Sequence, residues 1–387
     1  MKKILALVLA LCMVFALCAC GAKTEAPAEA PAAEAPAAEA PAAEAPAFKV
    51  AMITDYGDIT DQSFNQTTYE GCKEFCEANS IDFKYYKPAG DSTAERVAMV
   101  DAAVADGFNV IVMPGFAFGE TVVQTVELYP DVYFVALDVS QGDLGDFVLP
   151  ENVFCAVYQE ELCGYMAGYA AVKLGYTKLG FLGGMAVPAV VRYGYGFVQG
   201  ADAAAAELGL TDVTMNYAYG NQFFGDADIT AAMDTWYSAG TEVVFACGGG
   251  IYTSAAEAAA KVGGKVIGVD VDQAAIIDGD YGEGMTVTSA MKGLSATVKS
   301  VLGDLILNDA WSNYAGQVST LGLIGEDPEA NFVQLPVAST QFAEGFTEAD
   351  YTALVAAMFK GEITVSSDIE AEPAVTAITV DYQGNIK

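Results

Sequence analysis

The stretch from Ala51 to Gly71 combines side chains that suit the binding of a small molecule. An apolar run ends there at Asp55, and the pair Phe64 and Asn65 stands just before an expected helix. A carboxylate accepts hydrogen bonds from hydroxyl or amine groups, and a phenyl face stacks on a flat heteroaromatic ring. Because small ligands of open α/β sheets bind at the carboxyl ends of strands, these residues predict one wall of a ligand-binding site.

Similar residues stand at the ends of other expected strands. Asp138 and Asp270 each follow an apolar run, and Gly249 and Gly250 belong to a glycine triplet after another such run. Glycines let a ligand approach backbone N–H groups at the start of a helix. Each aspartate has an alternative role as a helix cap, so each alone is weak support. Two sheets that face each other across a cleft would bring these strand ends together.

A second aromatic turn, with Phe223 and Phe224, follows a strand in the other half of the chain. Aromatic turns from two lobes would clamp a planar base between them. Lys292 follows a strand near the expected passage from one lobe to the other and is one of few basic residues. Its ammonium would donate to a ligand oxygen, neutralise a neighbouring aspartate, or do both.

Short apolar strands alternate with helical segments, which indicates an α/β fold with parallel sheets covered by helices. The chain after the first 47 residues is longer than the roughly 250 to 300 residues at which a single core tends to divide, so we expect two lobes. The expected strands are residues 49–54, 83–86, 110–113, 133–137, 153–157, 179–182, 213–217, 243–246, 266–269 and 285–289.

The N-terminus has the pattern of an export signal. Lys2 and Lys3 precede an apolar run, which is too short for the roughly 20 residues that span a bilayer. The Leu-Cys-Ala-Cys sequence that ends at Cys20 resembles a bacterial lipobox and implies that Cys20 carries a lipid after cleavage. We therefore expect a signal peptide at 1–19 and a lipid-anchored Ala/Pro/Glu tether at 20–47. The alternative is an ordinary secretory signal.

Composition excludes several classes of function. With 51 acidic and 17 basic residues, the net charge of −34 disfavours nucleic acid, nucleotides and anionic lipid headgroups as ligands. The absence of histidine excludes Ser-His and Cys-His nucleophiles. An odd number of cysteines after Cys20 argues against a disulfide framework and most metal sites. We expect no metal or cofactor, and expect these cysteines in the core: Cys72, Cys76, Cys155, Cys163 and Cys247.

Several spaced motifs resemble the basic membrane protein family, the lipoprotein substrate-binding components of ABC importers, several of which bind purine nucleosides. The resemblance runs from about residue 49 to 365 in unchanged order. It implies a periplasmic-binding-protein type I fold with two Rossmann-like lobes and a hinge. The motifs are Asp61-Gln-Ser-Phe-Asn65, Gly183-Gly-Met185 with Arg192-Tyr-Gly-Tyr-Gly196, Ala246-Cys-Gly-Gly-Gly250, Ile267-Gly-Val-Asp270 and Ser289-Ala-Met-Lys292.

The resemblance also implies roles for individual residues. Phe64 would stack on a base beside Asn65, and Asp270 would hold ribose hydroxyls. An aromatic residue from the other lobe, Phe224 slightly ahead of Phe223, would face Phe64. The remaining implied contacts are Asp55 and Asp138 to polar atoms of the ring or sugar, Gly249 and Gly250 through their backbone, and Lys292 to a sugar oxygen. Asp58 and Asp61 are expected to serve the turn and the helix cap.

The implied protein is not an enzyme but a lipid-anchored binding protein on the extracytoplasmic face of the cell membrane. It would deliver a nucleoside, foremost a purine nucleoside, to an ABC permease. We expect lobe 1 at 48–157, lobe 2 at 158–286, and a return to lobe 1 with the crossover and C-terminal segment at 287–387. The alternatives are a sugar or other small polar metabolite, a ligand-sensing signalling lipoprotein, and a calcium-dependent nucleoside hydrolase.

Overall fold

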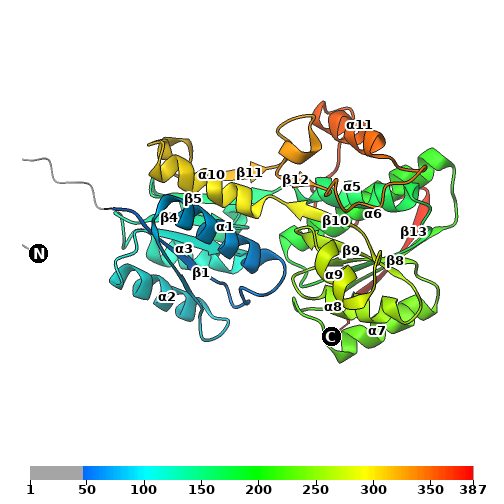
Figure 1. Cartoon of the computed structure of the whole chain (residues 1–387), viewed down its shortest axis with the longest axis horizontal. Coiled ribbons are helices and arrows are strands. Elements are labelled where there is room, and N and C mark those ends of the chain that lie inside the picture. The colour runs from blue at the N-terminus through cyan, green and yellow to red at the C-terminus, as the bar shows by residue number, and fades with distance from the viewer. Residues whose placement is uncertain (1–46, 387) are drawn as a thin grey trace, which may run out of the picture. The chain divides into compact units, whose positions relative to one another are not determined.

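The computed structural model describes residues 47–386, which form two lobes, each built on one β-sheet (Figure 1). The predicted signal peptide at 1–19, Cys20 and the predicted tether up to residue 46 lie outside the described residues. No helix within 47–386 is long and apolar enough to cross a membrane.

The sheet of lobe 1 is parallel throughout. Its six strands lie in the order β11 (Gln317–Leu321), β5 (Val153–Tyr158), β4 (Tyr133–Leu137), β3 (Val110–Pro114), β1 (Lys49–Ile53) and β2 (Asp82–Tyr86). Its helices are α1 (Phe64–Asn79), α2 (Thr93–Ala105), η1 (Phe116–Phe118), α3 (Gly119–Thr125), α4 (Gln141–Leu144), α10 (Leu294–Ile306) and η2 (Trp311–Asn313).

The side chains of β1 point alternately to the two faces of this sheet, and helices cover both faces. Val50 and Met52 pack in one cluster with residues of α1 and α10, whereas Ala51 and Ile53 pack in another with residues of α2 and α3. Side chains of a strand point alternately to opposite faces, so a run that is apolar at every position must be buried on both sides.

The sheet of lobe 2 is parallel except at one edge strand. Its seven strands lie in the order β12 (Val333–Gln334), β10 (Thr286–Lys292), β9 (Lys265–Asp270), β8 (Val243–Cys247), β6 (Lys178–Gly183), β7 (Val213–Tyr219) and β13 (Ile378–Asn385). Its helices are α5 (Glu160–Lys173), α6 (Pro188–Leu208), α7 (Ala227–Ser238), α8 (Tyr252–Ala260), α9 (Ala274–Tyr281), η3 (Pro328–Ala330) and α11 (Glu348–Phe359).

Both sheets share one winding order. In lobe 1, β1 lies between β2 and β3, and in lobe 2, β6 lies between β7 and β8. The direction of winding therefore reverses between β1 and β3 and again between β6 and β8. Such a reversal leaves a crevice outside the carboxyl ends of the two strands, and this crevice is where open α/β sheets bind ligands. The α/β fold with parallel sheets that the sequence predicted is confirmed.

The chain passes between the lobes three times: after Tyr158, after Lys292 and after Leu321. The prediction that residues 287–387 return to lobe 1 is wrong for a large part of this segment. The final residues of β10, together with β12 and β13, belong to the sheet of lobe 2, and α11 lies beside α5 (Figure 1). Because β13 is a half-exposed edge strand with polar side chains facing out, it lacks the apolar run that identified the buried strands.

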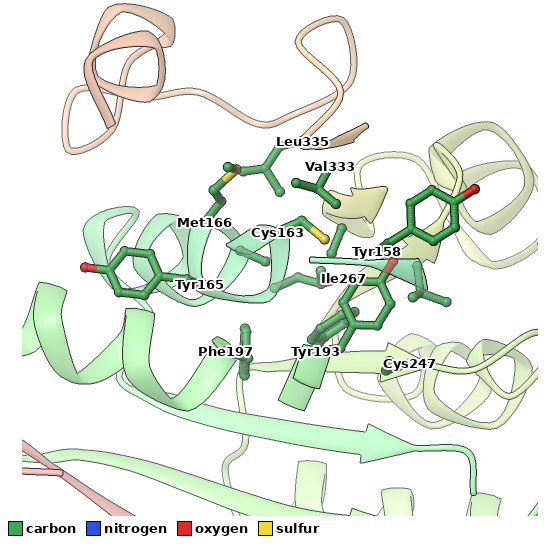
Figure 2. Close-up of a cluster of buried hydrophobic side chains, with 14 of the residues drawn as sticks. Tyr158, Cys163, Tyr165, Met166, Tyr193, Phe197, Cys247, Ile267, Val333 and Leu335 are labelled. Carbon is green, nitrogen blue, oxygen red and sulfur yellow. The ribbon is translucent and has the colours of Figure 1, made fainter. Parts of the chain in front are cut away.

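Helix α5 is covered on both sides. Cys163 and Met166 point towards Val333 and Leu335 of the C-terminal segment (Figure 2). On its other side α5 packs against α6 at glycine positions, where a Cβ at Gly168 would lie 2.1 Å from the backbone oxygen of Phe197. All five cysteines of the described residues are free and buried, as the sequence predicted.

This contact predicts a large loss of stability in Gly168→Ala. An added methyl group overlaps backbone rather than a movable side chain, so the two helices must separate, at a cost of about 1 to 3 kcal/mol. The matched control is Gly279→Ala in α9, where a Cβ meets nothing within 4 Å and alanine gains up to about 1 kcal/mol of helix propensity. Chemical denaturation measures the free energy of unfolding of both variants. Equal stability of the two variants would contradict the tight packing of α5 on α6.

Candidate functional site

A cavity of about 390 Å³ lies where the carboxyl ends of the two sheets face each other. All ten binding residues that the sequence predicted line it: Asp55, Phe64, Asn65 and Asp138 from lobe 1, and Phe223, Phe224, Gly249, Gly250, Asp270 and Lys292 from lobe 2. Asp55 follows β1 and the glycines follow β8, so both winding reversals open into the same cavity.

Asp55 and Asn65 form one group of hydrogen-bond acceptors in the cavity lining. Asp55 Oδ1 accepts the backbone N–H groups of Tyr56 at 2.6 Å and Gly57 at 2.7 Å, and the Asn65 side-chain amide at 3.3 Å. Burial raises the pKa of Asp55, although these hydrogen bonds oppose the shift. Asn65 Oδ1 is buried and has no partner within residues 47–386. This group of acceptors therefore suits a ligand that donates hydrogen bonds.

The neighbouring carboxylates are occupied by the turn itself. Asp61 accepts the backbone N–H groups of Asn65 at 2.9 Å and Gln66 at 3.0 Å, which lie in the first turn of α1. Asp58 accepts from Thr60 and pairs with Lys87 at 2.7 Å. Both aspartates line the cavity but have the turn and capping roles that the sequence analysis gave them.

Aromatic rings form two walls of the cavity. Phe64 begins α1, and the Lys292 Nζ atom lies 4.7 Å from the centre of its ring. In lobe 2, the backbone oxygen of Phe223 accepts the Gly250 N–H at 2.9 Å, which fixes the aromatic turn against the glycine triplet. Phe224 is 59% exposed, whereas Phe223 packs partly against the core. Both phenylalanines thus remain candidates for the wall opposite Phe64.

A second polar group in the cavity lining is centred on the Lys292 ammonium. Its Nζ lies 2.7 Å from Asp138 Oδ2, 3.6 Å from Glu160 Oε1 and 3.7 Å from Asp270 Oδ1. Burial alone lowers the pKa of Lys292, but the three carboxylates outweigh it and hold the pKa above its usual range. For Asp138 and Asp270 the effect of burial is the reverse: it raises the pKa of each carboxyl, and the Lys292 ammonium opposes this shift. Asp138 Oδ1 is a buried acceptor that no group in residues 47–386 meets.

The backbone at these two aspartates is unusual. Asp138 has φ of 59° and Asp270 has φ of 64°, both in the left-handed region that side chains other than Gly, Asn and Asp rarely adopt. Such conformations concentrate at functional sites because the surrounding structure must hold them. In each case the turn directs a carboxylate from a strand end into the cavity.

Three residues around Lys292 were not identified as site residues from the sequence. Glu160 is fully buried at the start of α5, and its Oε2 lies 2.7 Å from Arg192 Nε. Tyr193 lines the cavity and donates to Asp270 Oδ1 at 3.4 Å. Arg192 and Tyr193 lie in a motif that supported the resemblance, and an arginine in so acidic a chain was a usable signal. No sequence signal distinguished Glu160, because acidic residues are common in a first helical turn.

The arrangement has the features of a binding site. It offers aromatic faces for a planar group, two groups of acceptors for N–H or O–H donors, and one ammonium for an oxygen. Within the described range, 47–386, no group of three or more His, Cys, Asp or Glu side chains is placed to hold a metal ion.

Comparison with known proteins identifies the family. Residues 48–324 match the family described as Bmp, ABC transporter substrate-binding protein PnrA-like. The chain is 28% identical to the ABC transporter nucleoside-binding protein BmpA of Lactococcus lactis subsp. cremoris over 238 residues, 58% of this chain and 64% of that protein. It is 28% identical to basic membrane protein B of Borreliella burgdorferi over 284 residues, 71% of this chain and 78% of that protein.

Solved structures show the same fold. An ABC transporter solute-binding protein from Aeropyrum pernix K1 has a TM-score of 0.62 at 22% identity, covering 83% of this chain and 88% of its own. One from Conexibacter woesei has a TM-score of 0.64 at 22% identity, covering 83% and 99%. The periplasmic-binding-protein type I fold is thereby confirmed. Since the family match spans more than half of the chain, this protein belongs to the Bmp family of PnrA-like ABC transporter substrate-binding proteins.

Proposed function

We propose that the protein captures a nucleoside, foremost a purine nucleoside, between its two lobes and delivers it to an ABC permease. The observation that carries this proposal is the cavity itself, in which aromatic side chains of both lobes share the lining with two groups of hydrogen-bond acceptors. The printed name of the Lactococcus lactis relative, a nucleoside-binding protein, supports the same ligand class.

In this proposal the base lies against Phe64, with Phe223 or Phe224 on its other side. Base and aromatic ring stacking contributes roughly 1 to 3 kcal/mol per base. Asp55 and Asn65 accept hydrogen bonds from the base, and Asn65 Oδ1 would gain a partner that it lacks within the described chain. Backbone groups at Gly249 and Gly250 complete the base pocket.

The ribose is assigned to the polar group around Lys292. Asp270 accepts hydrogen bonds from the vicinal hydroxyls, Asp138 Oδ1 accepts another donor, and Lys292 donates to a sugar oxygen. Three carboxylates surround the single ammonium, so this group disfavours an added phosphate. A neutral nucleoside therefore fits better than a nucleotide.

The anchoring and delivery steps rest on the sequence signals and the family. A lipid on Cys20 would hold the protein at the extracytoplasmic face of the cell membrane, and the Ala/Pro/Glu tether would let the lobes reach a permease. No catalytic step is needed, because closure of the lobes around the ligand is sufficient.

The first prediction concerns the ribose. A carboxylate that loses a hydroxyl partner forfeits about 1.5 to 3 kcal/mol, so we expect 2′-deoxynucleosides to bind roughly tenfold or more weakly than ribonucleosides. Asp270→Asn keeps the left-handed backbone, which asparagine tolerates, and should reduce this ratio. Calorimetry with matched ribonucleosides, deoxynucleosides and free sugars measures it. Equal affinities for ribose and deoxyribose forms would exclude the assigned role of Asp270.

The second prediction concerns the base. Phe64→Leu keeps an apolar side chain but removes the stacking face, so nucleoside affinity should fall by roughly 5- to 100-fold. The control is Phe83→Leu, since Phe83 lies in β2 and contacts Tyr69 rather than the cavity. Fluorescence or calorimetric titration measures the nucleoside affinity of both variants. An unchanged affinity in Phe64→Leu would refute stacking at this wall.

The third prediction concerns pH. Burial raises the pKa of Asp55, Asp138 and Asp270, and the ionised carboxylates are the forms that accept the ligand's hydrogen bonds. Affinity is therefore full above the raised pKa values and is lost as the pH falls through them. We expect weaker binding at about pH 5 than at about pH 7.5, although an ordinary aspartate is still ionised at both. Thermal melting at each pH checks that the protein stays folded; a constant affinity would contradict the prediction.

A further inference from the structure

Two turns, one from each lobe, contact each other beside the cavity through reciprocal hydrogen bonds. Ser63 of lobe 1 donates its hydroxyl to Asp270 Oδ2 of lobe 2 at 2.5 Å. In return, the side-chain amide of Gln273 in lobe 2 donates to the backbone oxygen of Gln62 in lobe 1 at 3.0 Å. Each turn supplies one donor and one acceptor. We call these four residues the clasp.

Ser63 stands where a serine usually caps its own helix. A serine at the N-cap of a helix normally accepts a backbone N–H from the first turn, but Ser63 makes no such bond. Asp61 accepts the N–H groups of Asn65 and Gln66 instead. The Ser63 hydroxyl, which is fully buried, is thereby free to donate across the cavity.

The other clasp residues are also held in place by their own lobes. Gln62 has φ of 56°, an uncommon left-handed conformation that turns its carbonyl towards lobe 2. The side chain of Gln273 is buried, and its Oε1 accepts the Val269 N–H at 2.9 Å. This bond orients the amide so that its NH₂ group faces Gln62. Both turns are therefore shaped for the contact by bonds within their own lobe.

The clasp reaches the carboxylate that the proposed function assigns to the ribose. Asp270 Oδ1 faces Tyr193 at 3.4 Å and Lys292 at 3.7 Å, and both belong to lobe 2. Its Oδ2 faces Ser63, which belongs to lobe 1. One oxygen of the Asp270 carboxylate is thus held by lobe 1 and the other by lobe 2, and together these contacts fix the rotation of the carboxylate.

We propose that Ser63 is a positioning residue for Asp270, and that the clasp makes the orientation of this carboxylate depend on closure of the lobes. When the lobes separate, Ser63 withdraws and Asp270 loses the partner that fixes its Oδ2. Binding of the ligand's vicinal hydroxyls to Asp270 and closure of the two lobes then favour each other, as two coupled equilibria. The proposal rests on the proposed function, because it takes Asp270 as the ligand's hydroxyl acceptor.

The first test compares Ser63→Ala with Ser63→Thr, which keeps a hydroxyl, and with Thr68→Val. Thr68 is a buried residue of α1 whose hydroxyl bonds to the Phe64 backbone oxygen, so its variant also removes one buried hydrogen bond. Calorimetry measures the affinity ratio of a ribonucleoside to its 2′-deoxy form. We expect this ratio to fall about three- to tenfold in Ser63→Ala and to stay at the wild-type value in the other two. An unchanged ratio in Ser63→Ala would overturn the positioning role.

The second test needs no ligand. Gln273→Glu keeps the acceptor that faces the Val269 N–H but removes the amide donor to Gln62. Small-angle scattering of the ligand-free protein should give a larger radius of gyration for Ser63→Ala combined with Gln273→Glu than for the wild type or Thr68→Val. Identical radii would overturn the link between clasp and closure. If the wild type bound no nucleoside, the proposed function would fail, while this experiment would still decide whether the clasp closes the lobes.

Discussion

The buried ammonium of Lys292 determines how the cavity is built. Removal of an ammonium from water costs several kcal/mol unless charged partners surround it, so the carboxylates of Asp138, Glu160 and Asp270 must converge on it. Asp138 comes from lobe 1 and Asp270 from lobe 2, while Lys292 and Glu160 stand next to two of the passages between the lobes. The same interaction therefore joins the two lobes at the cavity.

The surplus of carboxylates has a functional meaning. Lys292 and Arg192 carry two positive charges against the three carboxylates of Asp138, Glu160 and Asp270, and Asp138 Oδ1 lacks a partner within residues 47–386. Asn65 Oδ1 also has no partner among these residues. Unmatched buried acceptors are unfavourable in the free protein, and in the proposed function the hydroxyl and amine donors of the ligand would supply the partners that these acceptors lack. Aromatic side chains that line the same cavity add the requirement that part of the ligand be flat.

Much of this arrangement was accessible from the sequence. Val50 to Ile53, Val110 to Met113 and Val243 to Cys247 are apolar at every position, which is the mark of strands buried on both faces. The expected strands, including less apolar ones such as β2, correspond to β1 to β10. Asp55, Asp138 and Asp270 stand at or within two residues of the carboxyl ends of β1, β4 and β9, so parallel topology brings them to the cleft. The strongest predictions were thus those in which burial and position along a strand coincide.

Other features depend on contacts that no local pattern reveals. Ser63 has the residue type and position of a helix cap, and its bond to Asp270, 207 residues away, appears only once the lobes face each other. Glu160 resembles any acidic residue of a first helical turn until Arg192 and Lys292 are placed beside it. The pairing of β13 with β7 likewise depends on a distant contact, because β13 adds to the edge of the lobe 2 sheet beside β7.

A crystal structure of the protein with a ribonucleoside tests the central claim most directly. The account predicts that the base stacks on Phe64, with Phe223 or Phe224 on its other face. It also predicts that both ribose hydroxyls lie within hydrogen-bonding distance of Asp270. A nucleoside bound outside this cavity, or one with its base beside Lys292 and its ribose beside Asn65, would contradict it.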